Sequence, residues 1–220
     1  MRSAAAWCVV LLLFGGADPG AQRRRTPPKP APRPVPLQTQ AAEVKCEEPL
    51  GKGMKTGASY CFVLAGRDPA EGVIVTLPPH SGPATLMFDL HNRHTYSEED
   101  VRAGRAYSRY AAGIGVLTMK GELISRAAVQ SEFRTATDLH ERISGGAGPS
   151  GAKAVAPIGR ELVYITIPQD VNQVSLLGEI LDAVTAAGRE TATPGRTVAV
   201  VSNIRVEYRP APAPKPRRLP

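Results

Sequence analysis

Residues 110–133 read YAAGIGVLTMKGELISRAAVQSEF, and this stretch decides the fold class. Apolar residues alternate with polar or small ones through Tyr110–Met119 and Glu122–Phe133, on either side of Lys120-Gly121. A period of two is typical of a half-buried strand, and a short link that contains glycine is typical of a hairpin. The stretch therefore predicts two antiparallel strands joined by a tight turn.

The same alternation continues along the chain. In residues 84–90, Leu86, Phe88 and Leu90 fall on one face of a predicted strand. Further strands are expected at Tyr60–Leu64, Gly72–Leu77, Thr137–Ile143, Ala154–Ile158, Glu161–Ile167 and Thr197–Tyr208. Many short strands separated by turns predict a mainly β protein, a β-sandwich of jelly-roll or immunoglobulin-like type.

Two segments depart from this pattern and predict one or two short helices. Ser97 precedes three acidic residues, as a capping residue does at a helix start, which predicts a helix over 98–106. Between Asp170 and Gly188 the apolar residues recur at helical spacing, which favours a second helix. The alternative for this segment is a strand over 174–181.

The N-terminus of the chain indicates export. Arg2, an apolar run over 4–14 and the small residues after it form the layout of a signal peptide, here residues 1–22. The run is too short for a comfortable membrane span. We expect a periplasmic or extracellular protein with a basic proline-rich linker (23–41), a single β-rich domain (42–208) and a basic proline-rich tail (209–220). Proline favours an extended chain, so both arms are expected to be disordered.

Charge is distributed unevenly. The formal net charge is +7, yet residues 42–208 carry slightly more acidic than basic side chains. The excess therefore lies in the two arms, which predicts loose attraction to an anionic surface such as lipid headgroups or acidic polysaccharide. The alternative is that the charges only keep the arms extended and soluble. A near-neutral body argues against a specific nucleic-acid partner.

The cysteines predict one disulfide. Cys8 lies within the signal peptide, which leaves Cys46 and Cys61 for the exported chain. Two cysteines in an oxidising compartment most simply pair with each other. The alternative, two free thiols, requires a reducing location.

Asp89, His91 and His94 form the densest polar cluster, at the end of a predicted strand. Such side chains could bind a divalent metal such as zinc or act as an acid and a base, which would make the protein a metal-assisted hydrolase. His80 would lie nearby if the strands over 72–77 and 84–90 pair through the turn between them. The spacing matches no diagnostic metal motif, and a solvated loop is the alternative.

Tyr96, Tyr107 and Tyr110 could form a stacking platform for a sugar, although tyrosines near a sheet edge usually belong to the core or its rim. Residues 146–151 match the spacing G-x-G-x-x-G, but Pro149 and the strand predicted after it exclude a dinucleotide site. No cofactor is predicted. The sequence thus favours a non-enzymatic binding or scaffolding module, with the hydrolase and a carbohydrate-binding domain as alternatives.

Overall fold

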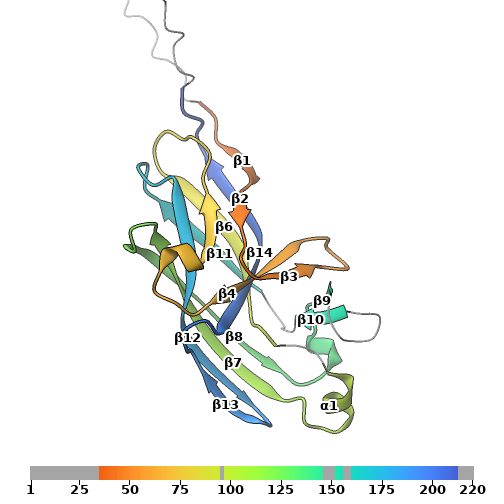
Figure 1. Ribbon diagram of the computed structural model, residues 1–220. Helices are drawn as coiled ribbons and strands as arrows, with labels where there is room; N and C mark the ends of the chain where they lie inside the picture. Colours follow the sequence, from red (N-terminus) through yellow and green to blue (C-terminus); the bar gives the residue numbers. More distant parts are fainter. Residues whose placement is uncertain (1–34, 95–96, 146–151, 156–159, 213–220) are drawn as a thin grey trace, which may run out of the picture. The chain divides into compact units, whose positions relative to one another are not determined.

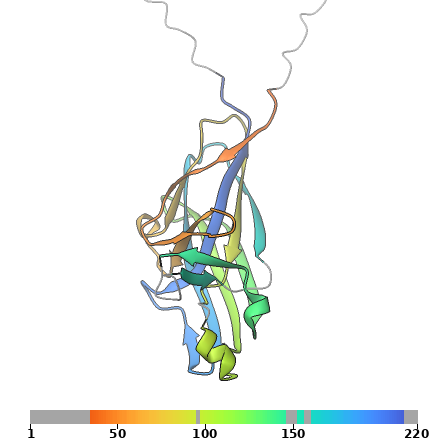
Figure 2. The same cartoon turned by 90° about the vertical axis from the view of Figure 1, so that its right-hand side faces the viewer.

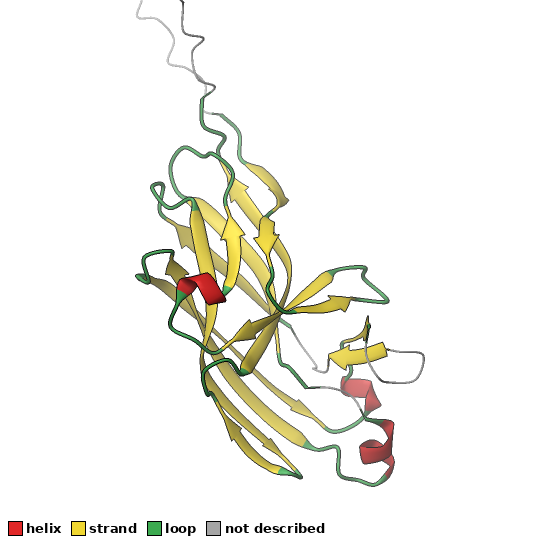
Figure 3. Ribbon diagram, in the orientation of Figure 1, coloured by secondary structure: helices red, strands yellow, loops and turns green. Residues whose placement is uncertain are grey.

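The computed structural model describes residues 35–94, 97–145, 152–155 and 160–212 of the 220-residue chain. These residues form antiparallel sheets almost throughout, which confirms the mainly β class (Figures 1 and 3). The predicted signal peptide, the Gly-rich stretch over 146–151 and most of both arms lie outside the described residues.

The first sheet has six strands in the order β11-β6-β14-β4-β3, with β1 also paired to β14. Its strands are β1 (Gln38–Ala41), β3 (Pro49–Lys52), β4 (Ser59–Leu64), β6 (Ala84–His91), β11 (Glu161–Ile167) and β14 (Thr197–Tyr208). β14 pairs with β6 on one side, and with β4 and then β1 on the other. Figure 2 shows β1 and β14 side by side, where Gln38 is opposite Tyr208.

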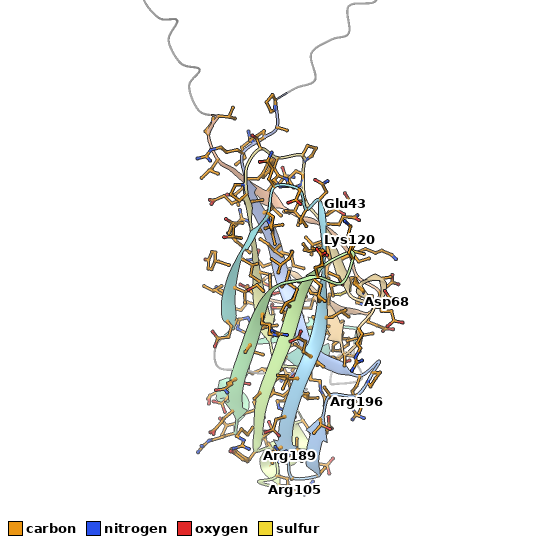
Figure 4. The ribbon with its side chains drawn as sticks, turned by 90° about the vertical axis from the view of Figure 1, so that its left-hand side faces the viewer. Glu43, Asp68, Arg105, Lys120, Arg189 and Arg196 are labelled. Atoms are coloured by element: carbon orange, nitrogen blue, oxygen red, sulfur yellow. A yellow bond between two sulfur atoms is a disulfide. The ribbon has the colours of Figure 1, made fainter. Side chains whose placement is uncertain are left out.

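The second sheet also has six strands, in the order β2-β5-β12-β7-β8, with β13 paired to β12. Its strands are β2 (Glu43–Lys45), β5 (Val73–Thr76), β7 (Ser108–Thr118), β8 (Leu123–Phe133), β12 (Gln173–Thr185) and β13 (Gly188–Thr191). β7 and β8 pair along their whole length, which confirms the predicted hairpin. Figure 4 shows Arg105 and Arg189 at one end of the molecule, and Glu43 and Lys120 toward the other.

Two short strands, β9 (Glu141–Ser144) and β10 (Ala152–Val155), pair with each other as a third, small sheet. The helical elements are α1 (Glu98–Arg102) and the 3-10 turns η1 (Pro69–Glu71) and η2 (Ala136–Asp138). Ser97 caps α1 as predicted, since its side chain accepts a hydrogen bond from the Asp100 amide. α1 ends earlier than expected, and η2 occupies the start of the strand that was predicted over 137–143.

The inner faces of the two large sheets share one apolar cluster. Residues of this cluster with no exposed surface include Val63, Leu86, Leu90, Val201, Val75, Ile114, Val116 and Leu176. A second, smaller cluster lies on the opposite face of the first sheet, where Ile143 of β9 and Val155 of β10 pack with Leu50, Tyr60 and Val200. The first half of β14 therefore has buried apolar side chains on both faces, which explains its continuous apolar run over 198–201.

The prediction of a helix over 170–188 is wrong, because this segment forms β12, the centre of the second sheet. Val174 and Leu176 are buried before a β-bulge between Gly178 and Ile180, and Leu181 and Ala183 are buried after it. The bulge moves the residues that pack in the main core from even to odd positions. The sequence therefore loses its period of two and resembles a helical spacing.

The strands over 72–77 and 84–90 do not pair with each other, so the condition for placing His80 beside the polar cluster is not met. β5 belongs to the second sheet and β6 to the first, so the turn that contains His80 carries the chain from one sheet to the other. Both strands present apolar side chains to the same core from opposite sides, and such a pattern does not reveal whether neighbouring strands pair. His80 instead forms an isolated bridge with Pro210.

Candidate functional site

The N-terminal strands cross from one sheet to the other beside a disulfide. β1 pairs with β14, the Ala42 amide donates to the Ile204 carbonyl at 3.0 Å, and β2 then pairs with β5. Cys46, just after β2, is joined to Cys61 of β4 with 6.0 Å between their Cα atoms, which confirms the predicted disulfide. This bond therefore holds the crossing segment against the first sheet.

A groove of about 800 Å³ lies along this crossing. It is lined by residues of β1, β2, β3, β4 and β14 and of the turns that follow them, among them Ala41, Ala42, Val44, Cys46, Pro49, Lys52, Ala58, Tyr60, Cys61, Asn203, Ile204 and Arg205. Most of these side chains are apolar. A concave, mostly apolar surface with a few polar groups is the usual form of a small-molecule site.

Asn203 lines the groove at an irregular point of β14. It has a φ of 52°, in the left-handed region, and it lies in the irregularity between Ser202 and Arg205 of β14. Asn is one of the residues that adopt this conformation most readily. The β14 ladder is thus interrupted between its pairing with β4 and its pairing with β1. Lys52 and Arg205 are both exposed, and they make the charged rim of the groove basic.

The cluster predicted as a metal site is divided among different partners. Asp89 pairs with Arg160, whose Nη1 is 3.2 Å from Oδ2. His91 is fully buried, with Nε2 2.9 Å from the Ser202 hydroxyl, and its ring centroid is 5.1 Å from that of His140. His94 instead packs edge-on against Tyr110.

Within the described ranges, no group of three or more His, Cys, Asp and Glu side chains could hold a metal ion. The metal-assisted hydrolase stays a prediction, and its three residues contact separate partners.

Burial keeps the histidines neutral. Burial first, and then the neighbouring His140 and Arg160, lower the pKa of His91 to about 3. Burial, and then the Arg93 charge, lower the pKa of His94 to about 4. The pKa of His140 is also lowered, by burial and then by Arg160. At neutral pH these rings are therefore uncharged groups packed within the fold.

The Ser202–His91 pair has the residue types of a nucleophile and a base but lacks two features of a hydrolase. Ser202 is 2% exposed and His91 is 0% exposed, so a substrate has no path to the hydroxyl. In the part of the chain that the structure describes, Nδ1 of His91 has no hydrogen-bond partner, whereas a catalytic histidine is held there by an orienting group. The pair is therefore a buried contact between β6 and β14.

Glu141 joins the small β9–β10 sheet to the β3–β4 turn. Its carboxylate accepts hydrogen bonds from the Lys55 and Thr56 amides, the Thr56 hydroxyl and the Tyr60 hydroxyl, all between 2.7 and 2.8 Å. Burial alone would raise the pKa of Glu141, but the bonds from Tyr60 and Thr56 outweigh it and the pKa is lowered. The ionised carboxylate is thus the form that holds these segments together.

The three tyrosines do not share one environment. Tyr107 is 43% exposed, and Arg134 lies over its ring at 5.6 Å from the centroid. Tyr110 is 1% exposed and belongs to the core, so its ring offers no surface for stacking. Tyr96 lies outside the described residues. A sugar platform at Tyr107 stays a prediction.

Sequence reasoning missed the groove and most contacts of the histidine cluster. Tyr60 and Glu141 are 81 residues apart, and His91 and Ser202 are 111 apart. No spacing motif links such residues, because the order of strands in the sheet brings them together. One weak signal was available, since His140 and Glu141 lie at the start of a short strand that contains the apolar Ile143.

Neither the protein-family models nor the curated proteins include a match to this chain. None of the helices in the described residues has the length and apolar composition that crossing a bilayer requires.

Proposed function

We propose that the protein is an exported, non-enzymatic binding module, in which the two large sheets form a β-sandwich of jelly-roll or immunoglobulin-like type. The observation that carries this proposal is the apolar groove beside the Cys46–Cys61 disulfide. The disulfide supports a pre-formed groove, because it fixes two of the lining residues relative to each other. A site that is formed before binding loses less conformational entropy when its ligand arrives.

The lining suggests the chemistry of the ligand. Val44 is 36% exposed in the groove, and Ile204 is partly buried beside it, so an apolar body would gain from covering them. The charged side chains of the lining, Lys52 and Arg205, are both basic. The ligand that fits best is therefore an amphiphile with an apolar chain and an anionic head group.

Titration of 15N-labelled protein with decanoate, below its micelle concentration, tests this proposal. Amide shifts should change around Val44 and Ile204, and decanoate should bind at least about tenfold more tightly than decanol. Arg205→Gln should remove most of that preference, and Val44→Glu should weaken binding of both compounds. Ile180→Glu is the matched control, because Ile180 is 61% exposed on β12, which contributes no residue to the groove. Shifts scattered over the surface, or equal binding by Val44→Glu, would contradict the proposal.

The arms complete the proposed module. Gln38 of β1 is opposite Tyr208 of β14, so both basic segments are joined to neighbouring strands. Two arms that start side by side can engage one anionic surface together, which raises their combined affinity. Deleting residues 23–34 should weaken retention on anionic vesicles at low salt without changing the melting temperature. Unchanged retention at low salt would contradict this role.

A further inference from the structure

β11 is an edge strand without the usual protection. In the described residues it pairs with β6 alone, so its other side has backbone groups with no strand partner. The other edge strands of the two large sheets are protected. Charged residues or proline occur in β2, β3, β8 and β13, and β1 consists of four polar or small residues. β11 reads ELVYITI and has no charge after Glu161. Charges and prolines at edges prevent pairing with other chains, and β11 lacks them.

The outward face of β11 is apolar and exposed. Leu162 is 54% exposed and Tyr164 is 65% exposed, the highest exposures of large hydrophobic side chains in this sheet. Tyr164 is directly opposite Met87 of β6, which extends the apolar surface inward from the edge. Large aromatic and aliphatic side chains gathered at one exposed place indicate an interaction surface.

The core is also incompletely covered on this side. β11 of the first sheet contacts β8 of the second, and we name this side the β8–β11 seam. Val163 of β11 and Ile124 and Ala127 of β8 pack against the main core but are only partly buried. On the opposite side, the crossing segment and the disulfide join the two sheets. The β8–β11 seam has no such closure among the described residues.

From these observations we infer that β11 pairs antiparallel with β11 of a second copy of the chain, which joins two first sheets into one. Pairing centred on Tyr164 sets it opposite Tyr164 of the second copy. Leu162 is then opposite Thr166, Val163 is opposite Ile165, and Glu161 is opposite Ile167. No two like charges are opposite each other in this register. Residues on the outward face of one strand are opposite residues on the outward face of the other.

The sequence of β11 favours a second copy because its one charge, Glu161, meets no like charge in this register and its central aromatic residue meets its own copy. A two-fold axis through such a strand gives a closed, isologous dimer. The aromatic pair at the axis adds a favourable cross-strand contact. The second copy would also cover the partly exposed core residues of the β8–β11 seam.

Sedimentation equilibrium of the full chain, over a concentration series that reaches the millimolar range, tests the inference. We expect a monomer–dimer equilibrium and no larger species. Tyr164→Lys places two like charges opposite each other and should weaken the dimer by about tenfold or more. Ile180→Lys is the matched control, because Ile180 is similarly exposed at 61% but lies on a central strand, and it should leave the equilibrium unchanged.

Cross-linking tests the register. In a Cys8→Ser background, Tyr164→Cys should form a covalent dimer under mild oxidation, because directly opposite residues have Cβ atoms about 4.5–5.5 Å apart. Leu162→Cys should not, since its own copy lies several residues away along the strand. A monomer at every concentration, a dimer insensitive to Tyr164→Lys, species that grow beyond the dimer, or equal cross-linking of both cysteine variants would overturn the inference.

Discussion

Acidification below about pH 6.5 is expected to destabilise the domain through His91. The ring is fully buried between Tyr60 and His140, and Nε2 contacts the Ser202 hydroxyl. Burial lowers its pKa to about 3, so the folded protein resists protonation that the unfolded chain accepts readily. The stabilising contribution is therefore fully present above the unfolded pKa and is lost as the pH falls toward the folded one.

The size of the effect follows from the two pKa values. The pKa of His91 is about 6.5 in the unfolded chain and about 3 in the folded protein. Between these two values, each unit by which the pH falls lowers the free energy of unfolding by about 1.4 kcal/mol. Lowering the pH from 8 to 5 should therefore reduce the free energy of unfolding by about 2 kcal/mol through His91 alone. For a domain of this size, that loss lowers the melting temperature by about 4–8 °C.

Urea unfolding at pH 8 and at pH 5 measures this loss. His91→Gln removes the titrating ring and keeps an amide that can contact Ser202, so the fall in stability between the two pH values should shrink by about 2 kcal/mol. Ser202→Ala is the control, because it lowers stability at both pH values and keeps the ring, so the fall should persist. An equal fall in His91→Gln and the wild type, or an NMR titration of His91 near pH 6.5 in the folded protein, would refute the reasoning.

Three further changes have defined outcomes. Replacing both Cys46 and Cys61 with serine should lower the free energy of unfolding by about 3 kcal/mol, measured by urea unfolding, because their bond closes a loop across 15 residues. Glu141→Gln should cost about 1–3 kcal/mol and speed hydrogen exchange of the amides in the β3–β4 turn; unchanged exchange would contradict its clamping role. Gly178→Ala should lower the melting temperature, because its Cβ would lie 2.5 Å from a valine of β14. Gly113→Ala is the control and should leave the melting temperature nearly unchanged, because its Cβ would be 3.5 Å from its nearest neighbour, an ordinary contact. Equal effects of the two substitutions would argue against this packing.

The parts of the fold that the sequence predicts are those with an uninterrupted local pattern. The hairpin of β7 and β8, and the strands β11 and β14, follow from period-two alternation and turn residues. The disulfide follows from the number of cysteines. β12 fails because a bulge at Gly178 changes which positions face the core, and no local rule locates a bulge in advance.

The candidate site depends on topology, and therefore most of it could not be predicted. The groove exists because the chain leaves the first sheet at Ala42 and enters the second before Cys46. β1 and β2 are too short and too polar to stand out as strands. Likewise, the turn at His80 transfers the chain from the second sheet to the first instead of joining two paired strands. Only the pairing of β5 and β6 with strands far away in the sequence shows that the chain changes sheets at this turn.

The two sides of the domain are completed in different ways, which makes the two binding proposals independent. One side is joined by the Cys46–Cys61 bond and contains the groove, and the other is the β8–β11 seam with its exposed edge strand. Val44 lies on β2, an edge strand of the second sheet, whereas Tyr164 lies on β11, an edge strand of the first, and their pairing partners differ. Substitutions at such distant positions usually have additive effects. A protein that carries both Val44→Glu and Tyr164→Lys should therefore lose decanoate binding and dimerisation to the same extents as the two single variants.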